Sequence, residues 1–70
     1  MNVYCINTSY DMTNNGIVKD WIADTPAGIT ADFDAESSPG STLLILSTKD
    51  LYVKNSKGAW QKYGTEEVLA

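Results

Sequence analysis

Apolar residues along this chain come in short runs, separated by residues that favour turns. The first run, VYCI at residues 3–6, is β-branched and aromatic and predicts a strand. The pair Asn15-Gly16 predicts a loop or hairpin tip, because both residue types tolerate a positive φ. The run IVKDWIA at residues 17–23 predicts a second strand, with a short helical turn as the alternative.

Residues 25–40 show little periodicity and are punctuated by Pro26 and Gly28. The segment predicts an extended arm or a long loop, with one short strand at residues 29–33. Loops of this length inside a compact domain tend to be functional or to order on binding. We therefore expect this segment to wrap a neighbouring protein.

The segment 41–64 has the clearest strand pattern. TLLILS at residues 42–47 contains four consecutive apolar positions, which predicts a strand covered on both faces. LYVKN at residues 51–55 predicts a second strand, and residues 59–63 predict a third after a turn in which Gly58 supplies a positive φ. Together they predict a three-stranded antiparallel meander.

Alternation within the meander predicts which side chains face the core. Leu51 and Val53 are expected to point inward, and Tyr52 and Lys54 outward. Across the next turn, Trp60 is expected to lie beside Tyr52 as a cross-strand aromatic pair.

These runs predict a mostly β fold. We expect a small antiparallel meander or sandwich-like domain with a long loop or extended arm, spanning residues 1–70 as a single domain. A core built from 70 residues is thin, and small scaffolds compensate with disulfides, a structural metal or oligomerisation. The chain has one cysteine and no histidine, so association with other subunits is the route that remains.

Cys5 lies inside the apolar run NVYCIN. Its simplest interpretation is a small buried hydrophobe, and the alternative is a reactive or intermolecular thiol. A lone cysteine also fits synthesis in a reducing compartment.

Charge is distributed unevenly along the chain. Residues 1–40 carry six acids and one lysine, a net charge of −5, whereas residues 41–70 carry four lysines and three acids, a net charge of +1. Arginine is absent, so the chain lacks the basic face that nucleic acid attracts, and no nucleic-acid partner is expected. Without a long apolar run or a signal-peptide pattern, we expect a soluble, unexported protein with no membrane partner.

No motif for catalysis, metal binding or cofactor binding stands out in the sequence. Asp32, Asp34 and Glu36 are spaced like the start of an EF-hand loop, but Ser37 stands where glycine is needed and Leu43 where the glutamate is needed. A serine or cysteine nucleophile needs a base, and histidine is absent. We expect a non-enzymatic protein with no catalytic residues, metal or cofactor.

Aromatic side chains are the candidates for an interface. In a small β-domain they are most often core or cross-strand braces, and the alternative is that they anchor a partner. Unpaired backbone on edge strands also invites strand addition from a neighbouring chain, which is the expected mode of docking. The interface candidates are Trp21, Phe33, Tyr52, Trp60 and Tyr63.

The segment PGSTLLILSTKDLYVKNSKGAWQKYG resembles the Tyr- and Trp-marked hairpins of small virion proteins of tailed bacteriophages, including head-decoration and head-fibre base proteins. The pattern is Gly-Ser, an apolar strand, a Thr-led turn, an apolar-Tyr-apolar strand, a Gly turn and a Trp. In this chain those places are taken by Gly40, Ser41, Thr48, Tyr52, Gly58 and Trp60.

The resemblance implies a non-enzymatic structural protein of a bacteriophage virion, made in the host cytoplasm. Its expected role is capsid decoration and stabilisation or fibre attachment, with the major capsid or another virion protein as partner, as a homo-oligomer or bound to the lattice. Two alternatives stay open. The first alternative is a small acidic phage protein that binds and inhibits a host protein. The second is a tail or receptor-binding accessory module. Binding through the acidic half would weaken steeply with salt.

Overall fold

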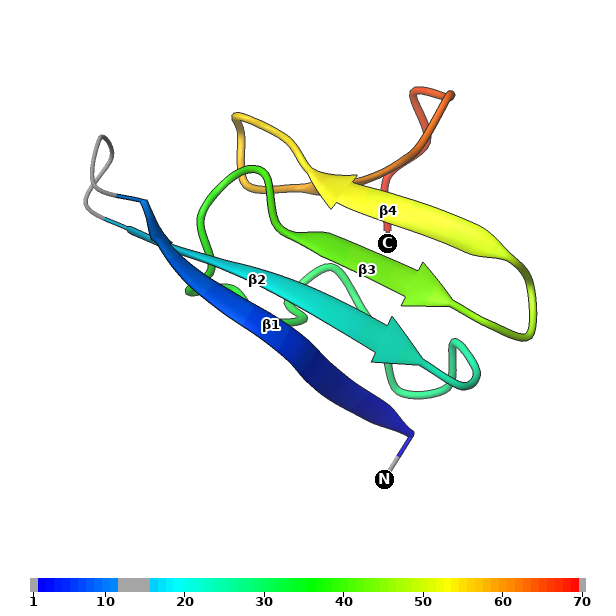
Figure 1. Ribbon diagram of the computed structural model, residues 1–70. Coiled ribbons are helices and arrows are strands. Elements are labelled where there is room, and N and C mark those ends of the chain that lie inside the picture. Colours follow the sequence, from blue (N-terminus) through cyan, green and yellow to red (C-terminus); the bar gives the residue numbers. More distant parts are fainter. Residues whose placement is uncertain (1, 12–15, 70) are drawn as a thin grey trace.

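The computed structural model describes residues 2–11 and 16–69, which fold around one five-stranded sheet. Figure 1 labels four of its strands, β1 to β4. The prediction of a mostly β fold is confirmed, and the described residues contain no helix. Residues 12–15, which include Asn15 of the predicted hairpin tip, lie outside the described residues. In spatial order the strands are β1 (Val3–Asp11), β2 (Gly16–Ala23), β3 (Thr42–Ile45), β4 (Asp50–Lys54) and β5 (Trp60–Lys62).

The sheet is mixed because one of its pairings is parallel. β1 pairs antiparallel with β2, and β3, β4 and β5 pair antiparallel in turn across the segment 41–64. β2 and β3 are parallel neighbours, with Trp21 opposite Leu43 and Ala23 opposite Ile45. Parallel neighbours need a crossover connection of a dozen or more residues, and residues 24–41 supply it.

The crossover, residues 24–41, folds back over one face of the sheet, behind it in the view of Figure 1. The predicted extended arm over residues 25–40 is therefore not confirmed, and the short strand predicted at residues 29–33 is replaced by turns. The physical reason is the parallel pairing, which obliges the chain to return across the sheet. Three successive backbone bonds shape the turns: Ile29 N–H to Pro26 O, Phe33 N–H to Thr30 O, and Ser37 N–H to Asp34 O.

The core lies between the crossover and the face of the sheet that it covers, here called the covered face. Its fully buried apolar side chains are Ala23, Leu43, Ile45 and Trp60. Partly buried side chains pack around them, and these are Val3, Trp21, Ile29, Phe33, Tyr52 and Leu69.

The predicted orientation of β4 is wrong. Lys54 is only 3% exposed and Tyr52 packs against the core, so both point to the covered face. By strand alternation, Leu51 and Val53 point to the opposite face. Both faces of β4 carry apolar residues, so alternation alone does not tell which face points to the core. The core face is the one that the crossover covers. Tyr52 is directly opposite Lys62 rather than Trp60, so the two aromatic residues share a face as diagonal neighbours.

β3 is covered on one face, whereas the run of four apolar residues at 43–46 predicted cover on both. Leu43 and Ile45 are buried, but Leu44 is half-buried and Leu46 is exposed. The crossover supplies one covering layer only, and the described residues supply none on the other side of the sheet. That other side is here called the open face.

Candidate functional site

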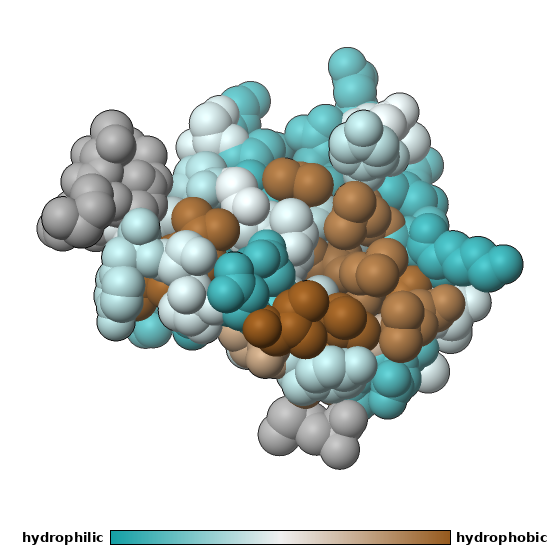
Figure 2. All heavy atoms as spheres, in the orientation of Figure 1, coloured by the Kyte–Doolittle hydropathy of each residue, from teal (hydrophilic) through white to brown (hydrophobic). Residues whose placement is uncertain are grey.

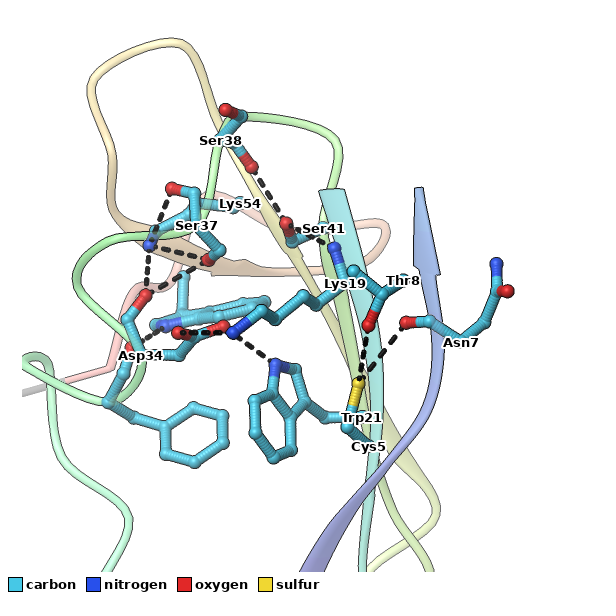
Figure 3. Close-up of polar contacts among 12 residues, drawn as sticks. Cys5, Asn7, Thr8, Lys19, Trp21, Asp34, Ser37, Ser38, Ser41 and Lys54 are labelled. Atoms are coloured by element: carbon cyan, nitrogen blue, oxygen red, sulfur yellow. Dashed lines mark hydrogen bonds and ion pairs between the residues drawn. The ribbon is translucent and has the colours of Figure 1, made fainter. Parts of the chain in front are cut away.

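A polar cluster fastens the crossover to the covered face, and Lys54 stands at its centre (Figure 3). The Lys54 amine donates to the backbone oxygen of Asp34 at 2.6 Å, to the backbone oxygen of Ser37 at 3.1 Å and to Ser37 Oγ at 2.9 Å. It also lies 5.1 Å from the centre of the Trp60 ring. Burial lowers the pKa of Lys54, and the Asp34 carboxylate acts in the opposite direction.

Asp34 links the cluster to β2. Its carboxylate accepts a hydrogen bond from the Trp21 indole at 2.7 Å and lies 4.0 Å from the Lys19 amine (Figure 3). Asp34 has a positive φ of 45°, which a short polar side chain tolerates better than most. The turn at Asp34 thereby aims its backbone oxygen at Lys54 and its carboxylate at Trp21.

A serine hydroxyl beside a buried lysine amine is an arrangement found in hydrolytic sites, and Ser37 and Lys54 have this arrangement. Ser37 is itself buried, and its Oγ donates to the backbone oxygen of Asp34 at 2.9 Å while it accepts from Lys54. The Ser37 hydroxyl and the Lys54 amine therefore both hold the turn in place. Trp60 Nε1 adds a hydrogen bond of 2.7 Å to the backbone oxygen of Phe33. The contacts of Lys54, Asp34, Ser37 and Trp21 fasten the crossover to the sheet, and this group is here called the latch.

The two edges of the sheet are treated differently. Beyond β5, the tail adds backbone bonds from Lys62 N–H to Glu67 O at 2.7 Å and from Leu69 N–H to Trp60 O at 2.9 Å. The Lys62 amine is held on β4 by an ion pair with Asp50 at 3.3 Å and reaches the tail through an ion pair with Glu67 at 3.9 Å, and its hydrogen bond to Asp50 raises the pKa of Lys62. The outer side of β1 has no such cover among the described residues.

β1 is a long edge strand that presents apolar side chains. No charged residue occurs from Val3 to Tyr10, and Tyr4, Ile6 and Tyr10 are exposed. A bulge between Cys5 and Asn7 breaks the register with β2 and divides the strand into two runs. Such an edge carries none of the lysine or proline guards that usually block strand addition, although the bulge is itself a partial guard.

Cys5 is exposed, which corrects the expectation of a buried hydrophobe. It is opposite Trp21 in the register, but on β1 the packed core reaches only Val3. Its thiol donates to the backbone oxygen of Asn7 at 3.2 Å and lies 3.5 Å from Thr8 Oγ1 (Figure 3).

The open face carries a row of apolar side chains that crosses four strands. In the register, Tyr4 is opposite Ile22, Ile22 is opposite Leu44, and Leu44 is opposite Leu51. Figure 2, which views this face, shows hydrophobic side chains gathered over β2, β3 and β4. Next to the row lies an open depression of about 300 Å³, lined by Val53, Asn55, Gln61, Lys62, Tyr63 and Gly64.

Four of the five interface candidates lie against the core. Trp60 is 1% exposed, and the Phe33 ring packs 5.1 Å from the Trp21 ring and 5.8 Å from the Trp60 ring. Tyr52 is half-buried against the same cluster. Tyr63 is 73% exposed and lines the depression on the open face.

The apolar residues Ile6, Ile22, Leu44 and Leu51 were not among the interface candidates from the sequence. The signal was present in the continuous apolar runs at residues 3–6 and 43–46. A continuous run predicts cover on both faces of a strand, and the structure supplies only one layer. The second apolar face of such a run therefore marks a surface that an isolated chain leaves exposed.

Within residues 2–11 and 16–69, no group of three or more potential metal-ligating side chains comes together. The described part of the chain likewise has no helix long and apolar enough to cross a membrane. Comparison with protein-family models, with curated proteins and with solved structures found no match for this chain.

Proposed function

We propose that this chain is a non-enzymatic structural protein of a bacteriophage virion, which docks on a capsid or other virion subunit through strand addition at β1. The observation that carries docking is the contrast between the two sheet edges. The tail closes the edge at β5, whereas β1 offers unpaired backbone along an uncharged run from Val3 to Tyr10. The virion setting is supported by the resemblance of residues 40–64.

Strand addition suits this edge for physical reasons. A partner strand would gain main-chain hydrogen bonds from β1, and alternate side chains such as Tyr4 and Tyr10 would supply specific contacts. The run Asn7–Asp11, on the far side of the bulge from Val3, pairs with β2 without a further register shift and so presents an uninterrupted template. Repeated copies on a lattice would add weak single contacts through avidity.

The rival function of an acidic decoy finds less support in the placement of the acids. Asp20 accepts hydrogen bonds from Thr42 and Asn7, and Asp34 is held by Trp21. Asp20 lies on the open face and Asp34 lies in the crossover over the covered face. Two of the six carboxylates of the acidic half are therefore engaged in internal contacts on different sides of the molecule, which leaves Asp24, Asp32 and Glu36 as exposed acids.

The test is to quantify the chain by mass spectrometry in particles purified from the cells that produce it. We expect a fixed ratio to the major structural subunit. Tyr10→Lys should lower this ratio several-fold, because Tyr10 is 77% exposed and a lysine there guards the edge without disturbing the core. Thr30→Lys is the matched control, since it adds the same charge to the exposed crossover. Absence of the chain from particles would refute the virion role, and equal incorporation of both variants would refute docking at β1.

A further inference from the structure

The open face is a second unpartnered surface, distinct from the β1 edge. Its central row consists of Tyr4, Ile22, Leu44 and Leu51, which pair across four adjacent strands. Val53 extends the apolar area on β4 toward the depression. The hydrophobic side chains in Figure 2 form a patch at the middle of this face rather than scattered single residues.

Across the described strands β2 to β5, the open face carries little charge although the chain has a net charge of −4. Asp20 is the one charged side chain that the described strands β2 to β5 direct to it by alternation, and it accepts hydrogen bonds from Thr42 Oγ1 at 2.8 Å and Asn7 Nδ2 at 3.3 Å. The strand lysines Lys19 and Lys54 lie on the covered face, and Lys62, which lines the depression, is paired with Asp50 and Glu67. A second molecule of the same net charge can therefore approach the open face with little local repulsion.

The surface area also fits a missing layer. The molecule measures 33 × 27 × 19 Å, so a face of the two longer dimensions projects about 700 Å². That is close to the roughly 800 Å² per partner of a standard interface, and side-chain relief adds to the projected area.

We propose that a second copy of this chain covers the open face, giving a two-fold symmetric dimer in which two sheets pack face to face. A second copy presents a face of matching size, apolar character and low charge, and two-fold dimers are the commonest closed assemblies. Aligned sheets pack about 10 Å apart with their inner side chains interdigitated, which would bury the row of each protomer against that of its partner. Both crossovers would lie on the outside, and both β1 edges would remain free for a further partner.

The test measures the mass of the full chain in solution by light scattering after size exclusion and by sedimentation equilibrium. We expect a dimer of about 15 kDa, twice the 7.6 kDa of the chain. Leu44→Lys should raise the dimer dissociation constant at least about a hundredfold, because two lysines per dimer would lose water without a partner. Thr30→Lys, with the same charge change on the exposed crossover, should leave the dissociation constant unchanged.

A second variant guards against a folding defect. Leu51→Lys places the charge on β4 in the same row, and Trp fluorescence with circular dichroism shows whether each variant keeps the wild-type fold. A folded monomer for both variants supports the proposal. A wild-type chain that stays monomeric at every concentration overturns it, and so does a dimer that both folded lysine variants retain. Tyr10→Lys should keep the dimer while it lowers particle incorporation, so failure of the dimer and failure of virion docking are separate results.

Discussion

Replacing Lys54 by methionine tests whether the latch on the crossover stabilises the fold. Lys54→Met keeps the length and most of the volume of the side chain but removes the amine. Of the three acceptors, Asp34 O keeps the bonds from Ser37 N–H and Ser37 Oγ, and Ser37 Oγ keeps its bond to Asp34 O. Ser37 O has Lys54 as its one donor in the described structure, so the variant leaves it buried and unpaired.

The expected loss is about 2 to 3 kcal/mol of unfolding free energy. An unsatisfied buried carbonyl costs about 1 to 3 kcal/mol, and loss of the amine over the Trp60 ring adds about 0.5 to 1 kcal/mol. The variant also removes the cost of burying the charged amine, and this change opposes the loss. In some proteins, replacing a buried ion pair by apolar residues is stabilising for this reason. Here the amine has three oxygen acceptors in good geometry, so we expect the hydrogen bonds to outweigh the desolvation.

Urea denaturation followed by tryptophan fluorescence measures this loss directly, because Trp21 and Trp60 both lie in the cluster that the latch holds. A domain of 70 residues has an unfolding free energy of about 4 to 10 kcal/mol, so the midpoint should fall markedly. Lys57→Met, at an exposed turn position, is the control and should shift the midpoint little. An unchanged or higher midpoint for Lys54→Met would show that burying the charge costs more than its hydrogen bonds return.

Three further predictions concern the same fold. Burial lowers the pKa of Lys54 from its ordinary value of 10.5, so just below pH 10.5 the unfolded chain binds more protons than the folded chain. The unfolding free energy of the wild type relative to Lys54→Met should therefore rise with pH in that window, and a fall in paired urea titrations would contradict this. Phe33→Ala should cost about 2 to 3 kcal/mol by the same assay, because Phe33 packs between two indole rings, and a loss under about 1 kcal/mol would mean that the crossover is not anchored there. Gly58→Ala should cost about 1 kcal/mol through its φ of +82° alone, since no atom lies within 4 Å of the added Cβ, and a neutral result would refute the strained turn.

Under the two proposals together, the open face forms the dimer and the β1 edge binds the virion subunit. The open face would complete the thin core through a second copy, and β1 would engage the partner subunit. The exposed Cys5 thiol on β1 offers a native probe of this edge, because a maleimide should label it in the free protein and should be excluded when a partner strand covers it.

The sequence by itself determined where most of the strands lie and how the last of them turn. The short apolar runs at residues 3–6, 17–23 and 42–45 all lie in strands, because their side chains fit the pleated, half-buried surface of a sheet. Gly58 has the positive φ that its place between two runs predicted. These features depend on neighbours within a few residues, so they can be derived from a local pattern.

Only the tertiary structure decided the parallel pairing of β2 with β3, the path of the crossover and the face of β4 that became core. Residues 24–41 have no periodicity that reveals the sheet beneath them, so their role as a covering layer depends on contacts with distant strands. Lys54 is inward because the crossover brings the backbone oxygens of Asp34 and Ser37 to it. A lysine in an alternating strand predicts solvent, and it is buried only where another segment, distant in sequence, supplies the acceptors that its amine loses from water.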